Sequence, residues 1–216
     1  MLFKDGDRII FAGDSVTDTG RENALGDGDY GLGNGYVRLV NTFLTAYYPE
    51  YRYDLVNMGV SGNNSRQLLE RWDRDITALD PDVVFCMIGI NDIWRQFDAP
   101  AKPYKHILPD EYEANLDQMA QKSKNVRDFI FLSPFFMEAN KEDAMRKMCD
   151  EYAAIMRRVA KKNNRPFVDI QAEFDKFLQH RSGIGLSWDR VHPFYIGAMI
   201  IARAILREIG FDRPLF

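Results

Sequence analysis

The segment Asp82–Gly89, "DVVFCMIG", is the feature that most limits what this chain can fold into. Its apolar side chains follow one another without the polar alternation of a strand that has one face in water. A run of this length is typical of a strand covered on both faces, as in parallel sheets flanked by helices. We therefore expect an α/β protein built around a mostly parallel sheet.

Strand-length apolar runs and helical patterns alternate along the chain, which predicts a three-layer α/β/α sandwich of the flavodoxin-like kind with a five-stranded sheet. The length of 216 residues fits one domain, 1–216. The predicted strands are Arg8–Ala12, Arg52–Asn57, Asp82–Ile88, Asp128–Leu132 and Phe167–Asp169. The predicted helices are Tyr36–Tyr47, Ser65–Leu79, Pro109–Lys122, Asp143–Asn163 and Tyr195–Ile209.

Charge and hydropathy exclude several classes of function. With 28 basic and 32 acidic side chains and no basic run, the chain shows no footprint for nucleic acid. No apolar run approaches the length of a membrane span, and the N-terminus is too short and polar for a signal peptide, so we expect a soluble, cytoplasmic protein. The sequence leaves open whether a leader preceded it. Cys86 and Cys149 are expected to be buried, reduced thiols rather than a disulfide or metal site.

Small polar motifs follow the predicted strands. Gly13-Asp14-Ser15 ends the first strand, "NMGVSGNN" from Asn57 to Asn64 ends the second, and Gly89–Asp92 ends the third. A further polar segment, Ser187–Pro193, comes late in the chain. Ligands of open α/β sheets bind outside the carboxyl ends of the strands, so we expect these segments to converge on one rim.

Together these segments contain the parts for acyl transfer. Ser15 offers a hydroxyl nucleophile, His192 a base, and Asp189, three residues earlier, a carboxylate that can orient the imidazole. The backbone N–H groups of Ser15 and Gly62 and the side-chain amide of Asn91 could meet an oxyanion. Taken singly, each residue is more often a turn, a cap or part of a surface pair; their joint placement after successive strands predicts a site.

Aromatic residues lie near the same motifs. Trp94 follows Asn91 by three residues, Trp188 precedes Asp189, and Tyr30 and Tyr36 flank a glycine-rich stretch. Such rings could stack on a sugar or wall off a small acyl pocket, and ordinary core packing is about equally favoured for any one of them. A small pocket would make acetyl esters better substrates than octanoyl esters.

The stretch "TGRENALGDGDYGLGNGY" follows Ser15 and is rich in glycine. Its spacing matches neither phosphate-binding glycine pattern, so we interpret it as a wall of the pocket rather than a nucleotide loop. We also predict Asp14 and Arg95 to be substrate-binding residues. The alternative for Asp14 is a helix cap.

The four motifs resemble those of the SGNH hydrolases, also called GDSL-type esterases. The Ser block matches at Gly13–Ser15, with Val16 in place of leucine, and the others match at Asn57–Gly62, Gly89–Asp92 and Asp189–His192, in the family's order. The resemblance implies an α/β/α fold, Ser15 as nucleophile, His192 as base and Asp189 as its partner. It also implies an oxyanion hole from Ser15, Gly62 and Asn91, with no metal and no cofactor.

A narrower resemblance is to the bacterial acetyl xylan esterases. It rests on "GNGYV", "VNMGVSGNNSRQLLERW", "IGINDIWRQ", "WDRVHP" and "ARAILREIGF". It implies a serine carbohydrate esterase that removes acetyl groups from xylo-oligosaccharides, and a homo-oligomer, for which the "GFDRPLF" tail is a hint. The alternatives are a short-chain esterase, lysophospholipase or thioesterase of the same superfamily, and, in a different class, a non-catalytic carbohydrate-binding relative.

Overall fold

A parallel five-stranded sheet forms the centre of the computed structural model, which describes residues 2–23 and 25–213. The side chains of Asp29, Tyr30 and Lys105 lie outside this description. The strand order is β2-β1-β3-β4-β5, and every neighbouring pair is parallel. The strands are β1 (Arg8–Gly13), β2 (Asp54–Gly59), β3 (Val83–Met87), β4 (Asp128–Leu132) and β5 (Phe167–Val168).

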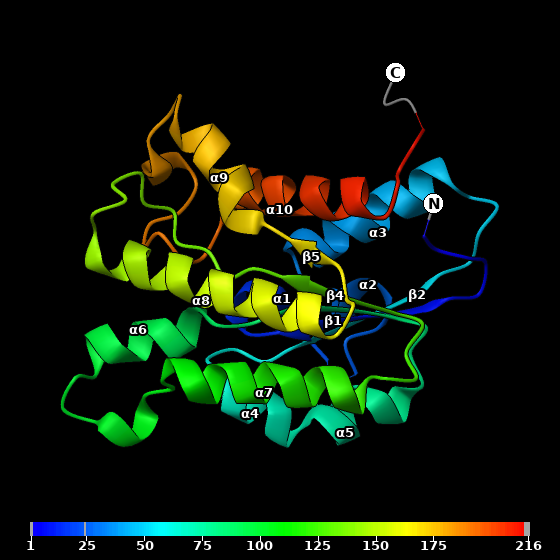
Figure 1. Cartoon of the computed structure of the whole chain (residues 1–216). Helices are drawn as coiled ribbons and strands as arrows, with labels where there is room; N and C mark the ends of the chain where they lie inside the picture. Colours follow the sequence, from blue (N-terminus) through cyan, green and yellow to red (C-terminus); the bar gives the residue numbers. More distant parts are fainter. Residues whose placement is uncertain (1, 24, 214–216) are drawn as a thin grey trace.

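Helices cover both faces of this sheet, which confirms the predicted three-layer α/β/α fold. Helices α3, α9 and α10 lie on one face and α4 to α8 on the other (Figure 1). The α-helices are α1 (Ser15–Asp18), α2 (Gly28–Gly31), α3 (Tyr36–Tyr47), α4 (Ser65–Glu70), α5 (Trp72–Asp75), α6 (Ile90–Asp98), α7 (Pro109–Lys122), α8 (Ala144–Lys162), α9 (Ile170–Leu178) and α10 (Tyr195–Glu208). Short 3-10 turns lie at η1 (Thr77–Leu79), η2 (Pro103–Lys105) and η3 (Gly183–Gly185).

The pleat of each strand divides its side chains between the two layers. In β1, Ile9 and Phe11 pack toward α3, α9 and α10, whereas Ile10 and Ala12 pack toward α4 to α8. All five residues of β3 are buried, as its continuous apolar sequence predicts. Both faces of the sheet therefore contribute to the core, and the polar residues that end the strands are left at its rim.

Some element boundaries differ from the sequence prediction. The second strand begins at Asp54 rather than Arg52. The predicted helix Ser65–Leu79 is interrupted at Arg71, whose backbone leaves helical geometry while its side chain reaches buried acceptors. Helices α6 and α9 were not predicted, because each is short and follows a strand almost directly.

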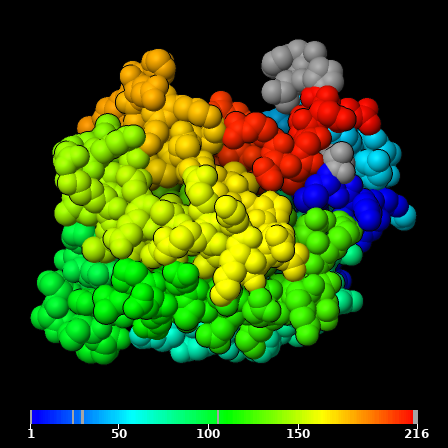
Figure 2. All heavy atoms as spheres, viewed as in Figure 1, coloured from blue at the N-terminus to red at the C-terminus, as the bar shows by residue number. Residues whose placement is uncertain are grey.

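The N-terminal residues lie against the end of the last helix. The backbone N–H of Leu2 donates to the carbonyl of Ile209 over 2.7 Å, and blue and red atoms adjoin in Figure 2. Cys86 and Cys149 are buried, as predicted, and burial raises the pKa of both thiols. Within the described part of the chain, no helix has the length and apolarity needed to cross a membrane.

Candidate active site

Strand register brings three of the predicted segments to one rim. Gly13, the last residue of β1, is in register with Gly59 at the end of β2 and with Met87 at the end of β3. Ser15 follows Gly13 by two residues, Gly62 follows Gly59 by three, and Asn91 follows Met87 by four. Because the strands are parallel, these residues emerge on the same side of the sheet.

Ser15 is the first residue of α1 and is half-buried. The preceding carboxylate, Asp14, caps this helix by accepting the backbone N–H of Val16 over 3.0 Å. At Gly13 a Cβ atom would meet the Thr17 hydroxyl at 2.2 Å and the Met87 carbonyl at 2.7 Å. The small residue before Asp14 thus lets the chain turn tightly from β1 into α1 and present the Ser15 hydroxyl at the helix N-terminus.

The Ser15 hydroxyl lies 2.8 Å from Nε2 of His192, and Nδ1 of the same ring lies 2.5 Å from Oδ2 of Asp189. The second carboxylate oxygen of Asp189 accepts the hydroxyl of Ser187 and the backbone N–H groups of Val191 and His192, all within 2.9 Å. Burial alone would raise the pKa of Asp189, but the hydrogen bonds from His192, Val191 and Ser187 outweigh it and lower that pKa to about 2. Asp189 is therefore ionised wherever the protein is folded at ordinary pH.

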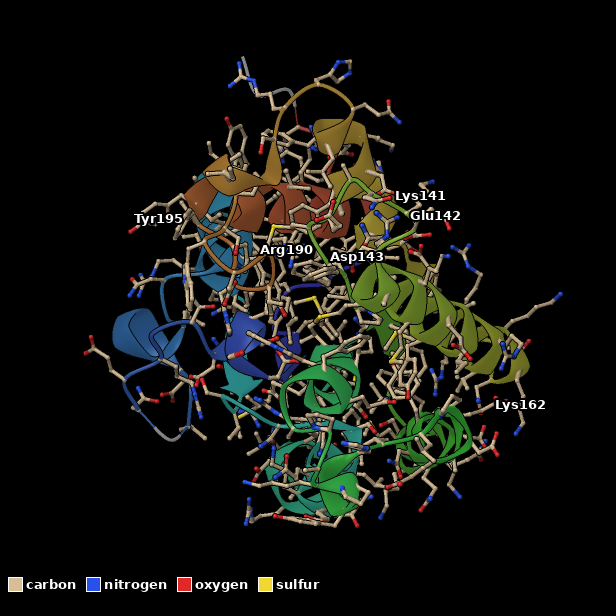
Figure 3. The ribbon with its side chains drawn as sticks, turned by 90° about the vertical axis from the view of Figure 1, so that its left-hand side faces the viewer. Lys141, Glu142, Asp143, Lys162, Arg190 and Tyr195 are labelled. Carbon is tan, nitrogen blue, oxygen red and sulfur yellow. The ribbon has the colours of Figure 1, made fainter. Side chains whose placement is uncertain are left out.

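Arg190 fixes the segment that carries the histidine and was not singled out from the sequence. It adopts a left-handed backbone conformation, with φ of 67°. Its carbonyl accepts the N–H of Met137 over 2.9 Å, and its guanidinium lies 2.7 Å from Glu138 and 4.7 Å from the ring centre of Phe136. Figure 3 shows Arg190 beside Asp143 at the start of α8, 3.9 Å away. This single residue attaches the segment Ser187–His192 to the segment after β4.

Gly62 and Asn91 are the residues predicted to supply oxyanion donors beside Ser15. Gly62 is exposed and has φ of +83°, a left-handed conformation that favours glycine. Asn91 lies in the first turn of α6 and is 3% exposed. Its amide nitrogen donates to the Asn63 carbonyl over 3.0 Å, and its amide oxygen accepts Arg95 over 3.2 Å. One N–H of the Asn91 amide is therefore held, which orients the other.

The tentative substrate-binding residues fall into different environments. The centre of the Trp94 ring lies 6.0 Å from that of His192, so Trp94 borders the triad. Trp188 immediately precedes Asp189 and is 77% exposed. Arg95 contacts Asn91 and pairs with Asp98, which gives it an orienting contact in the site. Asp14 is buried as a helix cap. The side chain of Tyr30 lies outside the described residues.

The glycine-rich segment packs on the second strand rather than standing free. Tyr36, at its end, is a core residue whose hydroxyl contacts Thr17 at 2.9 Å. Buried Asn57 holds the segment: its side-chain amide donates to the carbonyls of Thr17 and Leu32, at 2.7 and 3.0 Å. A Cβ at Gly26 would lie 1.8 Å from the Asn57 carbonyl, so this glycine permits the close approach. Asn57 was predicted as part of a motif, but its role in holding this segment was not predicted.

A buried carboxylate lies directly behind Asn91. Both oxygens of Asp92 accept the backbone N–H of Ser65, at 3.1 and 3.0 Å, and the Ser65 hydroxyl also donates to it. Asn115 donates to that hydroxyl over 3.0 Å. Burial raises the pKa of Asp92 to about 7 and that of Asp14 to about 6. The network connects α4, α6 and α7 beneath the rim.

A hydroxyl, an imidazole and a carboxylate in hydrogen-bonded series, beside N–H donors, form the arrangement used for nucleophilic acyl transfer. On a three-layer α/β/α sandwich it defines the class of serine hydrolases. Residues 11–197 match the GDSL-like lipase/acylhydrolase family, and the chain belongs to that family.

Several proteins are similar to this chain along nearly its whole length. An acetylxylan esterase of Geobacillus stearothermophilus is 46% identical over 214 residues, covering 98% of each chain. The crystal structure of Axe2, an acetylxylan esterase from the same organism, superposes with a TM-score of 0.96 at 45% identity, again over 98% of each chain. LAE5, described as an alpha/beta hydrolase enzyme from the metagenome of Lake Arreo, has a TM-score of 0.96 at 45% identity, over 99% of this chain and 100% of its own. Structures described as catalytic mutants of Axe2 carry alanine in place of a serine, an aspartate or a histidine.

Proposed function

We propose that this protein is a serine carbohydrate esterase that hydrolyses acetyl esters on xylo-oligosaccharides. The observation that carries the proposal is the series Ser15–His192–Asp189, with successive contacts of 2.8 and 2.5 Å. The acetylxylan esterase relatives, alike along nearly the whole chain, support both the reaction and the substrate class.

In the proposed mechanism the Ser15 hydroxyl attacks the acetyl carbonyl while Nε2 of His192 takes its proton. The oxyanion is met by the N–H groups of Ser15 and Gly62 and by the Asn91 amide. Collapse expels the sugar hydroxyl, protonated by His192, and leaves acetyl-Ser15. Water, deprotonated by the same imidazole, then releases acetate and restores the Ser15 hydroxyl. Asp189 stays ionised throughout and stabilises the imidazolium.

Two features of the segment that carries Asp189 support a sugar substrate. Trp188 exposes 77% of its surface immediately before Asp189, which leaves an indole face for a pyranose ring. A cavity of about 660 Å³ opens next to it, lined among others by Glu138, His180 and Ile184. Such a volume accommodates sugar units that extend beyond the acetylated one.

The test is to incubate the protein with acetylated xylo-oligosaccharides, other acetylated sugars and octanoyl esters in parallel and to measure the acid released. We expect acetylated xylo-oligosaccharides to be the best substrates. The control Ser15→Ala should lose on the order of 10⁶-fold in turnover and its labelling by a sulfonyl fluoride. Faster release from longer acyl chains would favour a lipase or thioesterase, and an unlabelled, inactive wild type would favour a binding protein.

Three finer expectations belong to the same proposal. A cytoplasmic enzyme would act on imported xylo-oligosaccharides rather than on the polymer, and cell fractionation tests this. Self-association stays a prediction that light scattering at micromolar concentration can check. The predicted independence from metal or cofactor would be tested by activity after dialysis against a chelator.

A further inference from the structure

The turn that carries Gly62 is anchored on both sides. The backbone N–H and hydroxyl of Ser61 donate to Asp18 of α1, over 3.1 and 2.5 Å. On the other side, the side-chain oxygen of Asn63 accepts Nε of Arg71 over 2.7 Å. The turn itself is closed by the N–H of Asn63 donating to the Val60 carbonyl, at 3.1 Å. The direction of the Gly62 N–H is therefore set by its two neighbours.

Arg71 uses its three nitrogens on three different segments. Besides Asn63, it donates to the carbonyl of Gly13 over 3.0 Å and lies 3.3 Å from Asp75. That same Gly13 carbonyl accepts the N–H of Val60 over 3.0 Å. Gly13 precedes the nucleophile by two residues, so one guanidinium joins the strand end that presents Ser15 to the turn that presents Gly62.

The same network reaches the third oxyanion donor. The carbonyl of Asn63 accepts the side-chain amide of Asn91 over 3.0 Å. A shift of Asn63 would therefore turn the Asn91 amide as well as the Gly62 peptide. A planar guanidinium, with donors in a fixed fork, is well suited to hold several acceptors in one geometry.

The burial of this cation needs an explanation beyond stability. Arg71 is 8% exposed, and burial lowers its pKa. Its ion pair is with Asp75, and that carboxylate is shared with Arg74, which approaches to 2.5 Å. Burying a charge with incomplete pairing costs stability, so an apolar side chain would serve a purely structural role better. A fixed positive charge beneath the oxyanion hole would stabilise the negative charge that develops there in the transition state.

We propose that Arg71 is a positioning residue of the oxyanion hole, which holds the turn 60–63 and, through Asn63, the Asn91 amide in place for the transition state. This inference rests on the function proposed above. It assigns no contact between Arg71 and the substrate.

The principal test is Arg71→Met, which removes every donor and keeps much of the apolar stem. We expect kcat to fall on the order of 10²-fold with KM for an acetyl ester nearly unchanged, because ground-state binding does not use the hole. Arg71→Lys, which keeps the charge and loses the fork, should recover part of that loss. The matched control is Arg74→Met: this neighbour also contacts Asp75 but is exposed, and its kcat should stay within about twofold of wild type.

A double-mutant cycle separates positioning from general weakening. Asn91→Ala alone should lower kcat on the order of 10²- to 10³-fold. If Arg71 acts through the hole, the double variant loses clearly less than the product of the two single losses. Binding of an alkyl boronic acid, which mimics the tetrahedral adduct on Ser15, should weaken in parallel with kcat/KM, whereas binding of a deacetylated xylo-oligosaccharide should not change.

A folded Arg71→Met protein with wild-type kcat, or losses that multiply fully in the cycle, would overturn the inference. If Arg71→Met does not fold, as shown by circular dichroism, Asn63→Ala is the substitute. It removes the side-chain oxygen that accepts Arg71, keeps the backbone carbonyl that accepts Asn91, and should lower kcat about tenfold with KM unchanged. A wild-type kcat for that variant would overturn the inference as well. Turnover close to wild type in Ser15→Ala would instead refute the proposed function, so the two failures are distinguishable.

Discussion

The candidate site has two halves that are built in different ways. The nucleophile half comprises Ser15, Gly62 and Asn91, which follow three adjacent strands whose ends are in register. The base half comprises Asp189 and His192, on a segment with no strand of its own. Side-chain contacts hold the base half against the segment after β4, and most of these come from Arg190. Sheet topology thus positions one half, and a few individual side chains position the other.

The carboxylates of the two halves also titrate in opposite directions. In the nucleophile half, burial raises the pKa of Asp92 to about 7 and that of Asp14 to about 6. In the base half, burial of Asp189 is outweighed by hydrogen bonds, and its pKa falls to about 2. The carboxylates under the strand ends therefore cost stability when ionised, whereas hydrogen bonds stabilise the ionised form of Asp189.

Apart from removal of the Ser15 nucleophile itself, the largest expected effect comes from the base half. Asp189→Asn keeps the side-chain volume but removes the charge that fixes the tautomer of His192 and stabilises the imidazolium. We expect kcat to fall on the order of 10⁴-fold. Steady-state kinetics with an acetyl ester measures this, and circular dichroism checks that the fold is retained. A loss below about tenfold would mean that Asp189 only shapes the segment.

A smaller effect is expected where the base half meets the sheet. Arg190→Gly removes the contacts with Glu138 and Phe136 but suits the left-handed backbone, which costs other residues about 1–2 kcal/mol. We expect kcat to fall about tenfold while the melting temperature changes little. Glu138→Gln, which breaks the ion pair without altering the backbone, is the control and should have the milder effect. If Arg190→Gly lowered the melting temperature as markedly as it lowered kcat, the contacts of Arg190 would support the whole fold rather than the base half alone.

The smallest effect concerns stability in the nucleophile half. The folded pKa of Asp92, about 7, lies above its ordinary value of 3.8, so between these values the folded protein keeps a proton that the unfolded chain releases. Stability from this group therefore falls as pH rises through that window. Asp92→Asn should remove this decline, so its melting temperature relative to wild type should rise by a few degrees from pH 4 to pH 8. A difference that is constant with pH would contradict the assigned pKa.

Prediction from the sequence was more successful for the nucleophile half. Its motifs are local and each follows an apolar run, so strand period and the rule that parallel strands end together place Ser15, Gly62 and Asn91 on one edge. The details were missed where the chain departs from local pattern. Asn91 lies in helix α6, which was not predicted, and the helix after Asn64 is broken at Arg71.

The supports of both halves could not be predicted, because they join residues far apart in the sequence. Arg71 and Gly13 are 58 positions apart, Ser61 and Asp18 are 43, and Arg190 and Glu138 are 52. Side-chain to backbone contacts of this kind leave no periodic signal. The left-handed backbone of Arg190 is likewise invisible, because no glycine or asparagine marks it.

The exposure of His192 bears on how each catalytic cycle would end. Its side chain is 38% exposed, so the imidazole that would activate water in the proposed mechanism is open to bulk solvent. Any small alcohol in that solvent would reach the acetyl-enzyme as readily as water does. The composition of the medium would then set the partition between acetate and a new acetyl ester, and the same residues would run as a transferase wherever acceptor sugars are concentrated.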